Sequence, residues 1–386
     1  MNVLFDSQAF DMQTHGGVSR CFAELYAHMP DSVKADIAVV ETDNVYLQQL
    51  GFKARGAVYR EFMGDSHSKW RRLQYKWHYN KQYGHLSHWD VMPDLNRYEQ
   101  ERLFTKRQFD VLHPTFFDGY FLPLIGNKPY VLTVHDMIPE IYRQYYKADD
   151  PQIIQKQCTI TKAAHLVAVS ENTKKDLVRL TGVPEEKVTV IYHGVDEKPY
   201  TPSLQHPFDF DYILYVGERH FYKNFAFFCR DCVPILRRHK NLMVVCTGKP
   251  FSPEEQYLME AFGMQDRFIQ TFVQTDQEFL DIYHYAVAFV YPSAYEGFGI
   301  PILEAYKADC PVMLNNASCF PEIAGDAAVY FKTTAEASDF EEQFETLYHL
   351  DTNEREVLLE RQRQRLKRYS WDVAARKLAT LYEQLA

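Results

Sequence analysis

Short apolar runs recur along the whole chain and are separated by longer stretches of mixed polarity. The runs are rich in Val, Ile and Tyr, which is typical of parallel strands buried on both faces and joined by helices. In the first half they predict strands at 3–5, 36–40, 111–113, 131–135, 166–170 and 188–192. In the second half they predict strands at 212–216, 243–247, 268–272, 287–291, 312–314 and 328–331. The two halves therefore repeat one architecture, and the fold class is α/β.

The length of the chain and a break in this pattern indicate two domains. At 386 residues the chain exceeds the usual size of one domain. Residues 194–210 carry three prolines and no periodic apolar pattern, so they are predicted to form the linker. We expect an N-terminal domain over 1–195, in which 41–108 is a candidate insertion, and a C-terminal domain over 205–369. Each is predicted to be a doubly wound sheet, which binds ligands at the carboxyl ends of its strands.

The last segment, 370–386, is predicted to be a helix that begins after Ser370 as its N-cap. One apolar stripe runs along it at helical spacing: Trp371, Ala374, Ala375, Leu378, Leu381, Tyr382 and Leu385. Such a stripe must pack against another part of the protein.

Composition and charge exclude several classes of protein. Hydrophobic residues make up 46% and charged residues 24%, as in ordinary globular proteins, and the net charge of −10 argues against a nucleic-acid-binding surface. The start of the chain lacks a signal-peptide pattern and no apolar stretch approaches 18 residues, so we expect a cytoplasmic protein. The seven cysteines are scattered, and the Cys229–Cys232 pair lies in a sequence that predicts a buried helix.

One segment, 66–89, combines basic and aromatic side chains. It contains Lys69, Arg71, Arg72, Lys76 and Lys81 together with Trp70, Trp77 and Trp89. Two interpretations stay open. The segment is either an amphipathic insertion that covers the N-terminal sheet, or a peripheral contact with the inner face of a membrane or with an anionic lipid-linked molecule.

The clearest chemical signal lies between Tyr291 and Ala305. An apolar strand there leads through a glycine-containing loop into a helix that begins near Pro301, a residue well tolerated in a first turn. A helix N-terminus presents unpaired N–H groups and partial positive charge, so phosphate is the expected ligand. Glu296 on the loop and Glu304, expected in the first turn, are good acceptors for sugar hydroxyls. The alternative for Glu304 is a carboxylate that merely complements the helix dipole.

Further candidate residues follow other predicted strands. Arg219 and Lys223 come after the strand that ends at Val216, at its carboxyl end, where ligands bind to a doubly wound sheet, although solvated basic residues are the common alternative. In the first half, Gly16 and Gly17 follow the first strand, and His135 ends the fourth. A plain loop and a structural histidine are the alternatives there.

These segments resemble one known family. The text YPSAYEGFGIPILEA and the following ADCPVMLNNASCFPEIAGDAAVYF are similar to the E-x7-E region of the retaining glycosyltransferases of family 4. The segment YILYVGERHFYKNF resembles the family's strand, Gly, Arg, Lys-Asn pattern, and HGGVSR, VHDMIPE and VIYHGVDE are also similar to family segments. The resemblance implies the GT-B fold, in which two Rossmann-like domains face each other across a cleft.

The resemblance also implies roles for individual residues. Glu296 would contact hydroxyls of the donor sugar and Glu304 the nucleotide ribose, while the backbone of Phe298, Gly299 and Ile300 would lie near the sugar and diphosphate. Arg219 and Lys223 would hold the diphosphate. Gly16 and Gly17 would lie beside the donor phosphates, and His135 near the sugar. His193 stands where the family usually has Asn, which leaves the role of that position open.

The activity implied by the resemblance is transfer of a hexose from a nucleotide sugar, with retention and without a metal ion or cofactor. The N-terminal domain would bind a saccharide or lipid-linked acceptor, the C-terminal domain the donor, and the last helix would pack back on the N-terminal domain. The similarity to mannosyltransferases of bacterial polysaccharide assembly favours GDP-mannose as donor, with a UDP-hexose second. A nucleotide-sugar epimerase and a non-catalytic nucleotide-sugar-binding protein remain as other classes.

Overall fold

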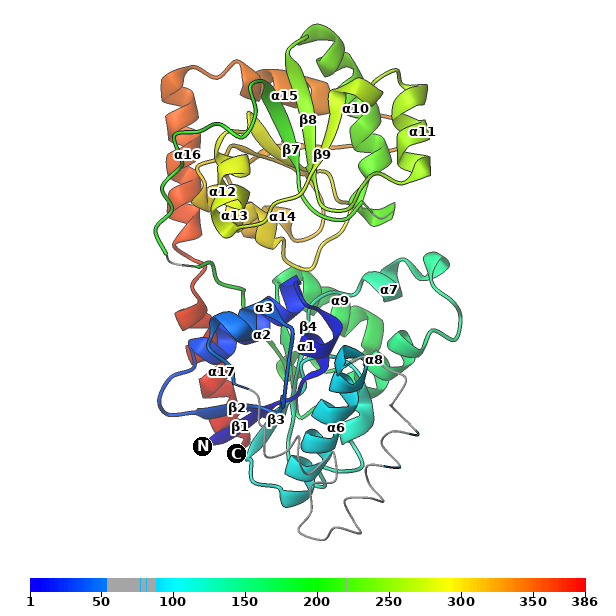
Figure 1. The fold of residues 1–386 in the computed structure, drawn as a ribbon, viewed down its shortest axis with the longest axis vertical. Helices are drawn as coiled ribbons and strands as arrows, with labels where there is room; N and C mark the ends of the chain where they lie inside the picture. Colours follow the sequence, from blue (N-terminus) through cyan, green and yellow to red (C-terminus); the bar gives the residue numbers. More distant parts are fainter. Residues whose placement is uncertain (54–76, 78–80, 82–87, 197, 220) are drawn as a thin grey trace. The chain divides into compact units, whose positions relative to one another are not determined.

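The computed structural model describes residues 1–386 except 54–76, 78–80, 82–87, 197 and 220, and it comprises two compact units. Unit 1 contains Met1–Val169, Thr173–Gly194 and Trp371–Ala386, and unit 2 contains Ser170–Asn172 and Val195–Ser370. Each unit is a parallel sheet covered by helices (Figure 1).

Unit 1 is built on two three-stranded parallel sheets in the orders β2-β1-β3 and β4-β5-β6. The strands are β1 (Asn2–Phe5), β2 (Lys34–Ile37), β3 (Val111–His113), β4 (Val131–Val134), β5 (His165–Ala168) and β6 (Val188–Val190). A single parallel bridge between Leu112 and Tyr130 joins the two sheets edge to edge. The strand order therefore reverses between β1 and β3, because the chain runs outward to β2 and then returns to the other side of β1.

Both faces of this sheet are apolar because neighbouring residues of a strand point to opposite sides. Val3, Phe5 and Val111 pack in one cluster with α2 (Gly17–Ala27) and α17 (Trp371–Leu385). Their neighbours Leu4 and Leu112 belong to a second cluster, which includes residues of α6 (His88–Lys106), α8 (Pro151–Lys162) and α9 (Glu171–Thr181). The helices of the two clusters lie on opposite sides of the sheet (Figure 1).

The last helix, α17, lies in unit 1 although 176 residues of unit 2 (195–370) precede it in the chain. Its predicted stripe is buried from Trp371 to Tyr382 and packs in the same cluster as α2. The phenol of Tyr382 contacts Nδ1 of His113 at 2.5 Å, and Nε2 of His113 lies 2.9 Å from the hydroxyl of Thr133. The core of unit 1 thus includes a buried polar link between α17 and the sheet.

Unit 2 is a six-stranded parallel sheet in the order β12-β11-β10-β7-β8-β9. Its strands are β7 (Asp211–Tyr215), β8 (Leu242–Thr247), β9 (Phe268–Thr271), β10 (Ala288–Tyr291), β11 (Val312–Asn315) and β12 (Val329–Phe331). This is the doubly wound order of a Rossmann sheet, and the order reverses between β7 and β10.

The remaining helices of unit 1 are α1 (Gln8–Met12), α3 (Val45–Gln49), η1 (Gly119–Phe121), α7 (Ile138–Ile141), η2 (Arg143–Tyr145) and η3 (Glu185–Lys187). Those of unit 2 are η4 (Phe221–Lys223), α10 (Phe225–Arg238), α11 (Pro253–Ala261), η5 (Gln265–Arg267), α12 (Asp276–His284), α13 (Ile300–Lys307), α14 (Phe320–Ala324), α15 (Phe340–Tyr348) and α16 (Thr352–Leu366). The Cys229–Cys232 pair lies buried on α10, as the sequence predicted.

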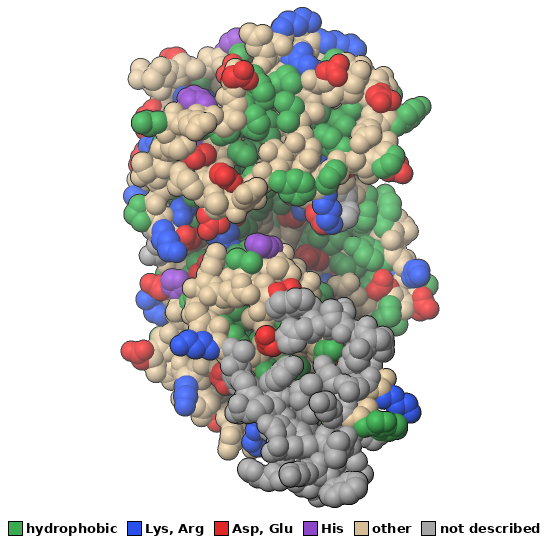
Figure 2. Space-filling view, viewed as in Figure 1, with side chains coloured by type: hydrophobic (Ala, Val, Ile, Leu, Met, Phe, Trp, Pro, Cys, Tyr) green, Lys and Arg blue, Asp and Glu red, His purple; other side chains and the backbone are tan. Residues whose placement is uncertain are grey.

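All twelve predicted strands are present, with ends that differ by no more than about three residues from those expected. Most of the basic and aromatic segment 66–89 lies outside the described residues, so its two interpretations stay open. Within the described part, Nζ of Lys81 lies 5.2 Å from the ring centroid of Trp77. Among the described helices, none combines the length and apolarity needed to cross a bilayer. Figure 2 shows acidic and basic side chains interspersed on the described part of one face.

The buried histidine of β3 makes the stability of unit 1 depend on pH in a defined way. Burial lowers the pKa of His113 to about 3, whereas the pKa of a histidine in the unfolded chain is about 6.5. Between these values the unfolded state binds the extra proton, so His113 destabilises the fold as the pH falls below 6.5. We expect His113→Gln to be less stable than the parent at pH 7, by about 1–3 kcal/mol. This difference should shrink by about 1.4 kcal/mol per pH unit between pH 6 and 4.

Urea unfolding followed by tryptophan fluorescence measures this effect, because all four tryptophans lie within the sequence ranges of unit 1. Val111→Ala is the matched control, since it removes buried side-chain volume from the same strand without removing a titrating group. Its stability difference from the parent should stay constant with pH. A constant difference for His113→Gln as well would contradict the prediction.

Candidate functional site

The candidate site of unit 2 lies where the strand order reverses, at the carboxyl ends of β7 and β10. The loop after β7 runs through η4 and ends at Asn224, whose backbone is left-handed with a φ of 54°. The side-chain amide of Asn224 donates a hydrogen bond of 3.0 Å to the carbonyl of Pro292, the first residue after β10. The two loops are therefore tied together directly beneath the predicted site residues.

Lys223 and Glu296 meet at this point. Nζ of Lys223 lies 2.6 Å from Oε1 of Glu296, and both side chains are largely buried. The phenol of Tyr291 also hydrogen-bonds Glu296, and burial raises the pKa of that phenol well above its usual value, so it stays a donor. Nζ of Lys223 lies 5.5 Å from the ring centroid of Tyr291. One carboxylate thus receives two donors in a poorly solvated setting, where charge-assisted hydrogen bonds are strong.

The loop that carries Glu296 is held rigidly up to the start of α13. The hydroxyl of Ser318 donates to the carbonyl of Glu296 at 2.7 Å and accepts from its N–H at 3.2 Å. Gly299 forms the N-cap of α13 with a φ of 95°, which few other residues adopt. A Cβ at Gly299 would also approach Ile302 and Phe320 to 3.1 and 3.3 Å. The helix therefore begins at Ile300 with its first N–H groups at the end of a fixed glycine loop.

Glu304 lies one position further into the helix than the sequence suggested, because the helix begins at Ile300 and not at Pro301. It is the fifth residue of α13 and not part of the first turn, because the left-handed Gly299 sets the start of the helix at Ile300. The phenol of Tyr283 donates a hydrogen bond of 3.3 Å to Oε2 of Glu304. The alternative that Glu304 merely complements the helix dipole from the first turn of α13 is therefore excluded.

The guanidinium of Arg219 is engaged elsewhere in unit 2. Nε donates to Oε1 of Glu255 in the capping box of α11 at 2.8 Å, and Nη2 donates to the carbonyls of Lys249 and Pro250. The group lies 4.9 Å from the ring centroid of Phe251. Nη1 is buried without a hydrogen-bond partner among the described residues. Arg219 thus braces the loop before α11.

The glycine pair in unit 1 opens helix α2. Gly16 precedes the helix in extended backbone, with a φ of 173°, and Gly17 is its first residue. A Cβ at Gly16 would approach the Oε1 atom of Gln13 to 2.2 Å. That oxygen accepts a hydrogen bond of 3.0 Å from the N–H of Ser19. A side chain at position 16 would therefore displace the Gln13 side chain that caps the helix, and no left-handed turn is involved.

His135 directly follows β4 and lies in an aromatic cluster. Its ring centroid is 5.8 Å from those of Phe22 and His193. Burial lowers the pKa of His135 to about 4, so the imidazole is neutral at physiological pH. Its Nε2 is buried without a hydrogen-bond partner among the described residues.

A buried group of possible metal ligands, unforeseen from the sequence, surrounds this histidine. One ligand atom each of Cys21, His135 and His193 lies within 4.8 Å of the other two. Burial raises the pKa of the Cys21 thiol and lowers that of His193 to about 3. The sulfur of Cys21 lies 3.4 Å from Nδ1 of His193, so these two side chains contact each other directly in the packing of α2.

Several residues of the site carried no signal in the sequence. Tyr291, Tyr283 and Ser318 reach Glu296 or Glu304 from separate strands, helices and loops. Aromatic and hydroxyl side chains at such positions are common in any core. Only the folded arrangement identifies them as partners of the two glutamates.

Comparisons with known proteins agree with this geometry. A family model described as "Glycosyltransferase Family 4" matches residues 15–198, and one described as "Glycosyl transferases group 1" matches residues 196–365. Together they span both units.

Curated relatives include O-antigen chain mannosyltransferase RfbU of Salmonella typhimurium, 27% identical over 55% of this chain and 63% of that protein. Another is O-antigen chain mannosyltransferase B of Escherichia coli, 26% identical over 66% of this chain and 70% of that protein. The match to RfbU thus spans less than two thirds of its length.

Among solved structures, Anabaena Alr3699/HepE in complex with UDP-glucose has a TM-score of 0.72 at 14% identity, with all of both chains covered. Sucrose-phosphate synthase from Thermosynechococcus elongatus has a TM-score of 0.67 at 18% identity, over 100% of this chain and 99% of that chain. At these low sequence identities, the structural similarity is evidence for a shared fold alone. With two family matches along its length and two Rossmann-like units, the chain belongs to the family 4 glycosyltransferases of the GT-B fold.

Proposed function

We propose that this protein transfers a hexose from a nucleotide sugar to a saccharide or lipid-linked saccharide, with retention of the anomeric configuration. The observation that carries the proposal is the Lys223–Glu296 ion pair beside the N-terminus of α13, at the strand reversal of unit 2. This arrangement combines a cation, a carboxylate and a helix N-terminus, which together can bind a sugar diphosphate. The positive groups suit the diphosphate, and the carboxylate suits the sugar hydroxyls.

The proposed roles follow from what each group can donate or accept. The first N–H groups of α13 and the ammonium of Lys223 hold the diphosphate and stabilise the charge that grows on the leaving phosphate. Glu296 accepts hydrogen bonds from the donor sugar, and Glu304 accepts them from the ribose. The unpaired Nη1 of Arg219 is a further donor toward the diphosphate. Positive charge is thus supplied by the protein, and no metal ion is needed.

Unit 1 is proposed to bind the acceptor. The neutral imidazole of His135 suits hydrogen bonding to a sugar hydroxyl, because it carries one donor and one acceptor nitrogen. For the donor we propose GDP-mannose, since the relatives named above are mannosyltransferases. A UDP-hexose is the alternative, supported by the solved neighbour in complex with UDP-glucose. The names of these relatives also favour a place in polysaccharide assembly. A cytoplasmic location stays a prediction from the sequence.

Substitution of the proposed donor-binding residues tests the proposal. We expect Lys223→Ala to lower the rate of nucleoside diphosphate release about 10²- to 10³-fold, because a fixed charge on the leaving group is lost. Glu304→Ala should chiefly raise KM for the donor. The measurement is nucleoside diphosphate release from a panel of GDP- and UDP-sugars with saccharide acceptors, followed by NMR of the anomeric proton in the product.

Matched controls are available in the same unit. Lys249→Ala removes a lysine whose side chain is 81% exposed, and Glu260→Ala removes an exposed glutamate from α11. Both should retain the parent rate. Equal losses in controls and site variants would contradict the assignment. A sugar that is altered without any acceptor would instead indicate an epimerase, and binding without consumption of donor would indicate a non-catalytic protein.

Removal of divalent ions tests the proposed source of positive charge. With EDTA in excess, we expect nucleoside diphosphate release to stay within about twofold of the untreated rate, because Lys223 and the α13 N-terminus replace the ion. The rate is measured before chelation, after chelation, and after adding Mg²⁺ or Mn²⁺. Loss of activity that returns with either ion would refute a metal-independent mechanism.

A further inference from the structure

A second cavity lies at the strand reversal of unit 1, between β1 and β3. Its volume is about 590 Å³, within the range of small-molecule sites. The described lining comes from the loop after β1, the loop after β3, α6 and the start of α8, and it includes Asp11, Arg97, Gln100, Phe117, Asp118 and Gln155. In a doubly wound sheet, this is the place where a ligand is expected on topological grounds alone.

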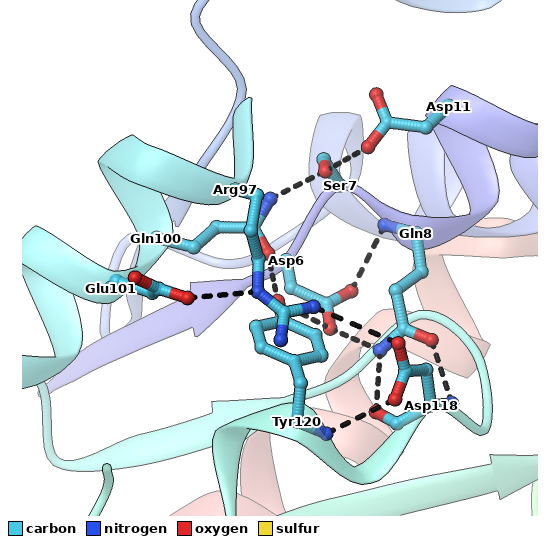
Figure 3. Close-up of polar contacts among 9 residues, drawn as sticks. All are labelled: Asp6, Ser7, Gln8, Asp11, Arg97, Gln100, Glu101, Asp118 and Tyr120. Carbon is cyan, nitrogen blue, oxygen red and sulfur yellow. Dashed lines mark hydrogen bonds and ion pairs between the residues drawn. The ribbon is translucent and has the colours of Figure 1, made fainter. Parts of the chain in front are cut away.

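A continuous hydrogen-bond network forms one wall of this cavity (Figure 3). Asp6 directly follows β1 and is fully buried. It accepts hydrogen bonds of 2.8 and 2.7 Å from the N–H and hydroxyl of Thr115, and one of 2.6 Å from Nε2 of Gln8. The phenol of Tyr120 bonds both Asp6 and Gln100. The network therefore joins the ends of two neighbouring strands to helix α6.

The network continues to the side chains that line the cavity. Gln100 donates to the hydroxyl of Ser7, and that hydroxyl donates to Asp11. Asp11 also accepts a hydrogen bond of 2.6 Å from the amide of Asn96. Polar groups this strongly coupled are fixed in direction before any ligand binds, which reduces the entropy cost of binding.

Arg97 stacks on Tyr120, a member of this network. Its guanidinium lies 3.2 Å from the ring centroid of Tyr120, Nε donates to Glu101 at 3.2 Å, and Nη1 lies 3.6 Å from Asp118. Asp118 in turn caps η1 by accepting from the N–H of Tyr120. The guanidinium is thus oriented by stacking and by two carboxylates and is partly neutralised by them.

The charges of the lining restrict the chemistry of the ligand. The described lining carries one cation, Arg97, and four carboxyl groups: Asp11, Asp94, Asp118 and Asp150. This balance disfavours phosphate, diphosphate and uronic acid groups, because their charge would lie near several carboxylates. Carboxylates and amides that alternate with apolar rings suit a molecule with hydroxyls at its edge and C–H groups on its faces. Phe116 and Phe117 supply such rings, with centroids 4.8 Å apart.

We propose that this cavity binds an uncharged sugar ring of the acceptor, with Asp118, Arg97 and Gln155 among the side chains that contact its hydroxyls. The proposal rests on the proposed function in taking the sugar to be the acceptor, but the binding itself is testable without turnover. It also assigns the cavity a selectivity: a neutral glycoside binds and its phosphorylated counterpart is rejected. Any diphosphate of a lipid-linked acceptor would then lie outside this cavity.

The experiment measures binding of methyl α-D-mannopyranoside and of mannose 6-phosphate to the full chain by saturation-transfer NMR titration. We expect the neutral glycoside to bind at least tenfold more tightly than the phosphate. Gln155→Ala should weaken its binding several-fold, whereas Gln157→Ala should not. Both glutamines are exposed on α8, but only Gln155 is among the described residues that line the cavity. Asp118→Asn keeps the oxygen that caps η1 but removes the negative charge. It should therefore reduce the difference in affinity between methyl α-D-mannopyranoside and mannose 6-phosphate.

Titration of GDP and UDP in the same samples separates the two proposals. Nucleotide binding without glycoside binding would overturn the sugar site and leave the proposed function standing. Glycoside binding that responds to Gln155→Ala, without nucleotide binding or donor consumption, would support the sugar site while the transferase proposal fails. Glycoside binding that Gln155→Ala and Asp118→Asn leave unchanged, in variants whose melting temperatures match the parent, would place the sugar elsewhere and overturn the inference. Tighter binding of mannose 6-phosphate would overturn it as well.

Discussion

The reversal of strand order in a parallel sheet is the constraint on which both sites depend. Where neighbouring strands send their chains to opposite sides, their carboxyl ends leave a space that no connection fills. In unit 2 this occurs between β7 and β10, and Lys223 and Glu296 come from the two loops at that point. In unit 1 it occurs between β1 and β3, and Asp6 bonds Thr115 there. Each site therefore joins residues that are far apart in sequence and adjacent at the sheet edge.

The fold could be predicted from the sequence because its signal is local. Strands buried on both faces must be apolar throughout, and Val3, Leu4 and Phe5 all serve as core residues although their side chains point to alternate faces. The approximate start of α13 could also be predicted, because a proline after a glycine loop is typical of the first turn of a helix. The start of the helix was misplaced by one residue, which put Glu304 in the first turn, since the sequence does not reveal that Gly299 is left-handed and that the helix starts directly after it.

The partnerships within the sites could not be predicted. Asp6 and Thr115 are 109 residues apart, and Lys223 and Glu296 are 73 residues apart. Nothing local in either sequence segment indicates the other. The internal partners of Arg219 could not be predicted either. Its place after β7 suggested a ligand-binding cation, but three of its hydrogen bonds go to Glu255 and to the loop before α11. Its burial required those partners, because an isolated guanidinium cannot be buried at low cost.

The two candidate sites differ in charge, as their proposed ligands would require. The diphosphate proposed for unit 2 brings negative charge, and unit 2 presents an ammonium and a helix N-terminus, with Glu296 pairing the ammonium within the protein itself. A sugar ring brings hydroxyls, which both donate and accept. In unit 1 burial raises the pKa of Asp11 to about 7, so this carboxyl is partly protonated near neutral pH. Burial also raises the pKa of Asp6. A partly protonated carboxyl offers a donor as well as an acceptor, and it lowers the negative charge that a buried acidic cluster would otherwise carry. The same burial that makes the acidic cluster tolerable in the core therefore also adapts it to an uncharged ligand.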